Sequence, residues 1–207
     1  MNKKKYNELI MAVKRNDLFD GDDFQGFKSA EDVDFQERIL DNYSYVKRGE
    51  AEEDEKLKQP IGYLVLVDED DRIFAYQRAL KDDDYTEKRL QGRWSWGVGG
   101  HVDKEDEGDN PIRKSMLREL GEEIEVDGEI NDISVLGYIN DDSDSVGRVH
   151  FGILYMVQIS GPVEANDDEV TNEGLRSISE LKEVIDDESV EVEEWSKIAL
   201  KLLEEIL

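Results

Sequence analysis

The chain contains no cysteine, and only two histidines and three prolines occur among its 207 residues. Without cysteine it cannot build a disulfide framework, a thiolate zinc site or a cysteine nucleophile. His101 and His150 are too few and too far apart in the sequence to predict a zinc site or a Ser/His triad. The missing cysteines fit a reducing compartment, so a cytoplasmic location is expected.

Long apolar runs are missing as well. The opening stretch MNKKKYNELIMAVKR is basic at its start, but its apolar run covers only Leu9–Val13 before charge returns. A secretory signal needs a longer apolar region, and no stretch approaches the roughly 18 apolar residues that span a membrane. The sequence therefore predicts a soluble protein with no membrane segment.

Positive charge is scarce beside negative charge. The 53 acidic residues outnumber the 26 basic ones and give a formal net charge of −27. Such a field repels nucleic-acid phosphates, which argues against general DNA or RNA binding, and it attracts divalent cations. Because 38% of the residues are hydrophobic, a chain of this length can bury one substantial core.

The composition changes near residue 58. Residues 1–58 are polar and charge-rich, and they predict a partly helical N-terminal extension. Within this extension, Asn7–Val13 and Val33–Tyr43 have helical patterns, and the stretch DLFDGDDFQGF resembles a loop. The charge run RGEAEEDEKLKQP is expected to be a solvated surface segment. Residues 59–207 form the predicted main domain.

Apolar, β-prone segments are frequent in the main domain. The turn DEDD between two of them predicts a β-hairpin, and RWSWGVGG predicts a short strand that runs into a glycine bend. Trp94 and Trp96 alternate in this strand and are expected in the core. The segments expected to form strands are residues 61–67, 72–78, 133–140 and 148–159, together with the start of residues 93–100.

Three helices are expected among these strands. Asn110 followed by Pro111 predicts the start of a helix in the middle of the domain. Ser177 with Glu180 three residues later is a capping-box pattern that opens a second helix. The last helix has an apolar face made of Trp195, Ile198, Ala199, Leu202 and Ile206. Strands with a helix between them predict a mixed α/β sandwich.

The middle helix ends in the acidic stretch RELGEE. Glu119, Glu122 and Glu123 stand at i, i+3 and i+4, which places the three carboxylates on one side of the helix. Like charges at this spacing cost a few tenths of a kcal/mol per pair. A hard divalent cation such as Mg²⁺ or Mn²⁺ would remove that cost. Ordinary surface charge is the alternative, because such triplets also arise by composition in this acidic chain.

The order of glycine bend, acidic loop and RELGEE resembles the signature of Nudix hydrolases, G-x5-E-x7-R-E-U-x-E-E-x-G-U with U apolar. The lead-in EKRLQGRWSWGVGGHVD is most similar to a bacterial or archaeal Nudix subgroup of predicted phosphoesterases. The resemblance covers roughly residues 58–207. It implies a Nudix-type α/β/α sandwich with a mixed β-sheet.

Two departures from the signature are visible. The stretch from Gly100 to Arg118 is four residues longer than in the signature, and Glu125 stands where its last glycine belongs. Because of the extra residues, the first glutamate of the signature has several possible equivalents in the acidic loop. These are Glu105, Asp106, Glu107 and Asp109.

The resemblance implies a hydrolase that cleaves a diphosphate linked to another moiety. Glu119 and Glu123 are then the chief ligands of Mg²⁺ or Mn²⁺, Glu122 joins through a second metal or a bound water, and the Gly100 carbonyl completes the shell. Arg118 is expected to hold a glutamate through a bidentate pair. Its other interpretation is an ordinary i,i+4 partner of Glu122.

Other roles follow less directly from the resemblance. Glu169 is the candidate for an extra metal ligand or general base, and Glu173 is second. Arg78 and Arg89 are candidate phosphate contacts, and His101, next to the glycine bend, is a candidate substrate contact. The partner is a small-molecule diphosphate, and a homodimer is one assembly compatible with the sequence.

Two other functions are compatible with the fold. An isopentenyl diphosphate isomerase-like enzyme shares it, but the best-known form of that enzyme relies on a cysteine that this chain lacks. A non-catalytic Nudix module would bind a nucleotide and regulate a partner. Such modules typically lose the carboxylates that are retained here, so the sequence favours catalysis.

Overall fold

The computed structural model describes residues 3–79, 90–166 and 170–207. The fold is α/β, a mixed sheet with helices, as the sequence predicted. It divides into two compact units, each made of three stretches of chain. Unit 1 comprises Met1–Tyr63, Gly99–Glu119 and Val135–Leu154, and unit 2 comprises Leu64–Val98, Leu120–Ser134 and Tyr155–Leu207. The division into residues 1–58 and 59–207 stays a prediction.

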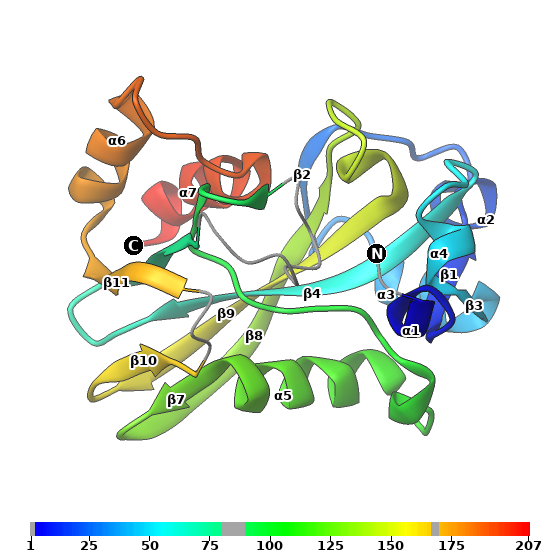
Figure 1. The fold of residues 1–207 in the computed structure, drawn as a ribbon, viewed down its shortest axis with the longest axis horizontal. Coiled ribbons are helices and arrows are strands. Elements are labelled where there is room, and N and C mark those ends of the chain that lie inside the picture. Colours follow the sequence, from blue (N-terminus) through cyan, green and yellow to red (C-terminus); the bar gives the residue numbers. More distant parts are fainter. Residues whose placement is uncertain (1–2, 80–89, 167–169) are drawn as a thin grey trace. The chain divides into compact units, whose positions relative to one another are not determined.

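Unit 1 contains most of the short helices (Figure 1). Helices α1 to α4 contact β1 or β3 or one another. Its elements are α1 (Lys3–Tyr6), β1 (Leu9–Lys14), α2 (Arg15–Phe19), β2 (Gly26–Ser29), α3 (Phe35–Asn42), β3 (Ser44–Lys47), α4 (Arg48–Ala51), η2 (Lys104–Asp106) and η3 (Gly147–Val149). It also holds the first part of β4 (Leu57–Val67), of α5 (Pro111–Glu123) and of β9 (His150–Ser160), and the last part of β8 (Glu129–Asn140).

The sequence predicted a helix at Asn7–Val13, and this prediction is wrong because residues 9–14 form strand β1. Four successive residues from Ile10 to Val13 are at most 1% exposed, so the segment is buried on both faces. A short apolar run of this kind is compatible with a buried strand, and pairing with β3 and β4 decides between the two structures. The second predicted helix is confirmed as α3, whose N-cap Asp34 accepts a hydrogen bond from Glu37 N at 3.0 Å.

The charge run before β4 is also less exposed than the sequence predicted. Gly49 and Ala51 are buried in α4, and Lys58 and Gln59 are completely buried in β4. Strand β4 begins at Leu57, four residues before the predicted strand, so this polar segment belongs to the sheet. The charged residues predicted an exposed segment. Inside unit 1, however, Lys58 hydrogen-bonds to Asp142 and Gln59 hydrogen-bonds to His101.

Unit 2 contains the predicted hairpin. Strand β4 pairs with β5 through Val67 and Ile73, and β5 also pairs with β6 and β11. Trp94 and Trp96 are buried, as predicted. The elements that lie wholly in unit 2 are β5 (Ile73–Arg78), β6 (Trp94–Ser95), β7 (Ile124–Val126), β10 (Val163–Ala165), β11 (Val170–Arg176), α6 (Ile178–Asp186) and α7 (Glu194–Ile206).

The two C-terminal helices confirm the prediction with one correction. Ser177 and Glu180 form the expected capping box of α6. In α7, however, the buried residues are Ser196, Ala199, Leu200 and Leu203. The predicted face is rotated from this one: only Ala199 belongs to both, and Ile206 is 46% exposed. The side chain of Ser196 faces inward because its Oγ accepts a hydrogen bond from Trp96 N at 3.2 Å.

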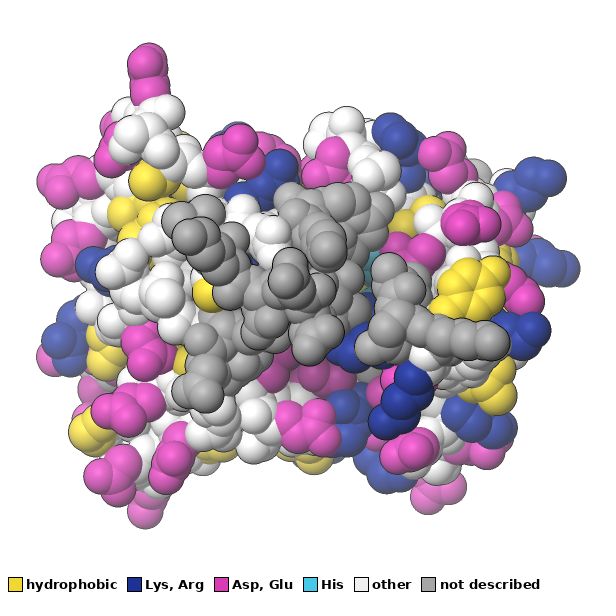
Figure 2. Space-filling model, in the orientation of Figure 1, with side chains coloured by type: hydrophobic (Ala, Val, Ile, Leu, Met, Phe, Trp, Pro, Cys, Tyr) yellow, Lys and Arg dark blue, Asp and Glu magenta, His cyan; other side chains and the backbone are white. Residues whose placement is uncertain are grey.

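No helix in the part of the chain that the structure describes is both long and apolar enough to cross a membrane. Acidic side chains are spread over the face of the molecule seen in Figure 2. Two acidic side chains are buried among the described residues: Asp106, which pairs with Arg118, and Glu193, which pairs with Arg78.

Candidate active site and neighbouring metal-ligand cluster

Helix α5 begins where the sequence predicted. Asn110 Oδ1 accepts a hydrogen bond from Arg113 N at 2.9 Å, which caps the helix ahead of Pro111. Ile112, Met116 and Leu120 are buried, so this face holds the helix in place. Leu117, which follows Met116 in the sequence, is 45% exposed and does not belong to that face.

The three glutamates of RELGEE stand on the last two turns of α5. Glu119 is half-buried, Glu122 is exposed, and Glu123 is half-buried. Because the chain is helical through Glu123, the i, i+3 and i+4 spacing places their side chains on one side of α5, as predicted.

Gly100 approaches the carboxylate of Glu119 closely. A Cβ atom at position 100 would lie 2.5 Å from Glu119 Cδ and from its Oε1. Real Cβ atoms do not come this close to other heavy atoms, so a residue with a side chain cannot occupy this position while Glu119 keeps its place. The bend thus brings a backbone and a carboxylate together, and oxygen donors of this kind suit Mg²⁺ and Mn²⁺.

Arg118 links the helix to the loop before it. Its Nε and Nη2 donate to the two oxygens of Asp106 at 3.2 and 2.8 Å, and its Nη1 donates to Glu119 Oε1 at 2.7 Å. Its Nη2 also lies 3.2 Å from the carbonyl of His101, which accepts a second hydrogen bond from Ser115 Oγ at 3.0 Å. The hydrogen bond to Asp106 and the charge of Glu119 raise the pKa of Arg118 above its ordinary value. The guanidinium therefore stays charged and fixes Glu119.

Comparison with known proteins identifies the family. The NUDIX domain family matches residues 57–197, which is more than half of the chain. The chain belongs to the Nudix hydrolases. Protein YmaB of Bacillus subtilis (strain 168) is 35% identical over 210 residues, which cover 97% of this chain and 99% of YmaB.

Solved structures show the same fold. The crystal structure of Tm1382, assigned to the Nudix hydrolases, superposes with a TM-score of 0.78 at 29% identity, over 97% of this chain and 100% of Tm1382. The NUDIX domain of Shewanella oneidensis NrtR, solved with ADP ribose, gives a TM-score of 0.53 at 16% identity, over 72% of this chain and 88% of that domain. The second likeness concerns the fold alone.

The structure distinguishes the four loop candidates for the first glutamate of the Nudix signature. Asp106 is 1% exposed and contacts Arg118, whereas Glu105, Glu107 and Asp109 are exposed. Asp106 also stands six positions after Gly100, where the signature has its glutamate. The four extra residues of this Nudix box therefore lie between Asp106 and Arg118.

His101 lies in a cluster that the sequence did not predict. Its Nε2 is 3.2 Å from His150 Nε2, 2.8 Å from Gln59 Oε1 and 3.9 Å from Glu52 Oε1. Burial, reinforced by the charge of Arg48, holds the pKa of His101 well below its usual range, so the imidazole is neutral at neutral pH. The separation of the two histidines in sequence wrongly indicated that they do not meet. The predicted substrate contact of His101 stays a prediction.

The remaining predicted residues are placed as follows. Arg78 Nε donates to Glu193 Oε1 at 2.5 Å, and its guanidinium lies over the Tyr76 ring. Glu173 Oε2 accepts a hydrogen bond from Ala165 N at 2.7 Å. Arg89 and Glu169 lie outside the described residues. The roles suggested for all four stay predictions.

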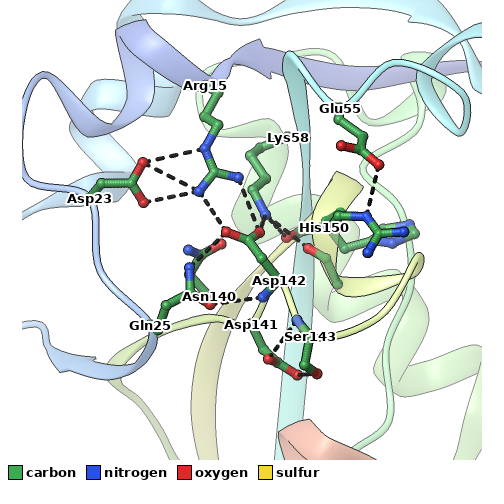
Figure 3. Close-up of polar contacts among 12 residues, drawn as sticks. Arg15, Asp23, Gln25, Glu55, Lys58, Asn140, Asp141, Asp142, Ser143 and His150 are labelled. Carbon is green, nitrogen blue, oxygen red and sulfur yellow. Dashed lines mark hydrogen bonds and ion pairs between the residues drawn. The ribbon is translucent and has the colours of Figure 1, made fainter.

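A second polar network surrounds Asp142 in unit 1 (Figure 3). Its carboxylate accepts hydrogen bonds from Arg15 at 2.6 and 3.0 Å, from Lys58 Nζ at 2.8 Å and from Gln25 at 2.7 Å. Burial alone would raise the pKa of Asp142, but the hydrogen bonds from Arg15 and Lys58 hold it well below its usual range. Asp142 thus balances the charge of the completely buried Lys58, whose Nζ also donates to the carbonyls of Gly147 and His150.

Sequence reasoning missed the roles of Gln59, Glu52 and Lys58. Glu52 was part of an acidic run, and Lys58 and Gln59 were part of a segment expected on the surface. The local signal points the other way: Pro60 directly follows Lys58 and Gln59, and a proline argues against extending the strand backwards across it.

Proposed function

We propose that this Nudix hydrolase cleaves the diphosphate of a small molecule with Mg²⁺ or Mn²⁺ held by Glu119, Glu122, Glu123 and the Gly100 carbonyl. The close approach of Gly100 to the Glu119 carboxylate is the observation that supports it most, because only a glycine leaves room there. The donors are carboxylate and carbonyl oxygens, the ligands that these two ions prefer. Glu122 and Glu123 are assigned from their helical spacing behind Glu119.

Each residue of the proposed site has a separate role. When bound, the ion neutralises diphosphate oxygens and acidifies a water for attack on phosphorus. Glu119 is oriented by Arg118, which is itself fixed by Asp106 and is therefore a positioning residue. Glu169 is proposed as the base that accepts the proton of the water, with Glu173 as the alternative.

The substrate class can be determined by a direct screen of diphosphate compounds. The NrtR domain was solved with ADP ribose, so ADP ribose belongs in the panel beside nucleoside triphosphates, nucleotide sugars, dinucleotides and non-nucleotide diphosphates. Arg78 and Arg89 are proposed to contact the substrate phosphates. In this setting Arg78 has to exchange its bond to Glu193 for a phosphate.

The experiment measures phosphate or nucleotide release across this panel with Mg²⁺ or Mn²⁺. Glu123→Gln is expected to lower kcat/KM by about 100-fold or more, because it removes one charged ligand. Glu125→Gln, which changes an exposed glutamate just beyond α5, is the matched control and should keep full activity.

Three results would contradict the proposal. Wild-type protein that turns over no compound and binds no divalent ion is not the proposed enzyme. Full activity in both Glu122→Gln and Glu123→Gln would place the metal elsewhere. Binding of a nucleotide without turnover would favour the regulatory module instead.

A further inference from the structure

Three polar side chains from separate parts of unit 1 point their ligand atoms at one another. Glu52 follows helix α4, His101 follows the glycine bend, and His150 opens strand β9. His101 Nε2 lies 3.2 Å from His150 Nε2. Glu52 Oε1 lies 3.7 Å from His150 Nε2 and 3.9 Å from His101 Nε2. The three atoms lie within 4.8 Å of one another, close enough to share one ion.

These distances fit a transition-metal ion. The circle through three points separated by 3.2, 3.7 and 3.9 Å has a radius of about 2.1 Å, which is close to the Zn–N and Zn–O bond lengths of about 2.0–2.2 Å. The two Glu52 distances also exceed the length of a good hydrogen bond. We therefore propose that Glu52, His101 and His150 form a binding site for Zn²⁺, separate from the carboxylate site on α5.

The surroundings of His150 support this role. Its Nδ1 lies 2.7 Å from the carbonyl of Val146, to which it can only donate, so Nε2 is left as the unprotonated nitrogen. A metal-binding histidine usually donates its other ring N–H to a carbonyl or carboxylate, which fixes its tautomer. Nε2 of His150 is the nitrogen that faces Glu52 and His101.

Gln59 provides a second, independent indication. Its side chain is completely buried and its Oε1 lies 2.8 Å from His101 Nε2. Its Nε2 makes no hydrogen bond within the described residues, an unusual state for a buried amide. In this structure Gln59 Oε1 accepts the hydrogen bond of His101 Nε2–H; when an ion displaces that proton, the same oxygen can supply the fourth ligand of a tetrahedral shell.

The donor set separates this site from the one on α5. Imidazole nitrogens suit Zn²⁺ and its neighbours in the first transition row, whereas Mg²⁺ prefers oxygen ligands throughout. His101 directly follows Gly100, and its carbonyl accepts hydrogen bonds from Ser115 and Arg118 of α5. An ion at His101 would thus hold the glycine bend in place beside Glu119.

The test titrates Zn²⁺ into chelator-treated full-length protein in excess Mg²⁺, followed by calorimetry and by the rise in Tm. One ion per chain is expected, and Glu52→Gln should weaken its binding by about 100-fold or more. Glu55→Gln is the matched control: Glu55 is exposed, pairs with Arg148 at 2.8 Å (Figure 3) and should leave Zn²⁺ binding unchanged. The double variant Glu122→Gln/Glu123→Gln should also keep the Zn²⁺ site.

X-ray absorption on the wild-type zinc protein keeps the proposal testable if a variant does not fold. Two imidazole ligands are expected in the zinc shell. A shell of oxygen atoms only, loss of the ion in Glu122→Gln/Glu123→Gln, or unchanged affinity in folded Glu52→Gln would each overturn the site. None of these experiments measures hydrolysis, so a negative result for the Zn²⁺ site does not contradict the proposed hydrolase activity.

Discussion

Arg118 holds Asp106 through two parallel hydrogen bonds, Nε to Oδ1 at 3.2 Å and Nη2 to Oδ2 at 2.8 Å. Asp106 is almost completely buried and Arg118 is partly exposed. A bidentate pair of this kind fixes the plane of the guanidinium, whose remaining nitrogen donates to Glu119. The lengthened Nudix box is therefore closed by an aspartate that reaches Arg118 from the loop.

Asp106→Asn should both destabilise the protein and lower its activity. The substitution leaves Arg118 without its main counter-charge, and we expect a loss of about 2–3 kcal/mol in unfolding free energy, below the ~3–5 kcal/mol of fully buried pairs. Residual activity should fall by about 10–100-fold because Glu119 loses its support. Urea unfolding and kcat/KM measure the two effects. Asp109→Asn, in the same loop but exposed, should change neither.

Gly100→Ala should weaken metal binding while the protein stays folded. The added Cβ would meet the flexible end of Glu119, which is displaced more easily than backbone. A drop of about 10–100-fold in Mg²⁺ affinity, measured by titration, is expected. Gly108→Ala is the control in the same loop, because the nearest atom to its Cβ is 4.0 Å away. Unchanged Mg²⁺ affinity in Gly100→Ala would mean that Glu119 does not bind the ion from its place beside Gly100.

Gly121→Ala tests the helix between the glutamates. A Cβ there meets no atom within 4 Å, so the change should stabilise α5 by about 0.5–1 kcal/mol without affecting activity. Thermal unfolding and kcat/KM measure the two quantities. Lower activity in this variant would mean that the surface beside Glu119 and Glu122 must stay open for the substrate.

Asp142→Asn should make the protein less stable at neutral pH, and the difference from wild type should shrink in acid. The folded-state pKa of Asp142 lies below its unfolded value of ~3.9, so its stabilising effect is complete above about pH 5. That effect is lost as the pH falls below about 4 toward the folded pKa. We expect a cost of about 2–3 kcal/mol at pH 7, because Lys58 keeps a buried charge without its carboxylate. Urea unfolding between pH 3 and 7 gives both curves.

Lys58→Met should be much milder than Asp142→Asn. The substitution removes the buried ammonium, and Asp142 keeps its hydrogen bonds from Arg15 and Gln25. Removing one partner of a buried pair is costly when the other charge is left uncompensated, but Asp142 is 24% exposed and keeps Arg15, so a change within about 1 kcal/mol is expected. If Lys58→Met costs as much as Asp142→Asn in urea unfolding, the hydrogen bonds of Lys58 to the Gly147 and His150 carbonyls matter more than its charge.

Leu203→Ala and Leu202→Ala test which face of α7 is buried. Leu203 is completely buried, so Leu203→Ala should lower the unfolding free energy by about 2–5 kcal/mol. Leu202 is half-buried, so Leu202→Ala should lower it clearly less. The two changes remove the same atoms from neighbouring positions, so urea unfolding of both compares burial directly. Equal losses would mean that the rotated face is wrong and that the pattern in the sequence was right.

The sequence predicted what depends on local patterns. The hairpin around DEDD, the cap at Asn110 and the capping box at Ser177 each rest on a few adjacent residues, and each is confirmed. Segments whose pattern fits two secondary structures are harder to predict. The apolar run Leu9–Val13 fits a helix or a buried strand, and its pairing with β3 and β4 decides between the two.

The site was predictable only in part for the same reason. RELGEE lies within one helix, so its geometry follows from the helical repeat. Which loop carboxylate reaches Arg118 depends on how the chain turns between Gly100 and Pro111, and no spacing rule covers a loop of unusual length. The meeting of Glu52, His101 and His150 depends on three distant segments, and the sequence contains no local sign of it.

The four extra residues of the box lie between Asp106 and Arg118, and residues 107–110 ahead of the helix are all exposed. Both halves of the motif keep their own spacing on either side of this stretch. Pattern searches that allow a variable gap here will therefore find relatives that a rigid template passes over. For protein engineers, the same stretch is a natural position for inserting a tag or a reporter peptide.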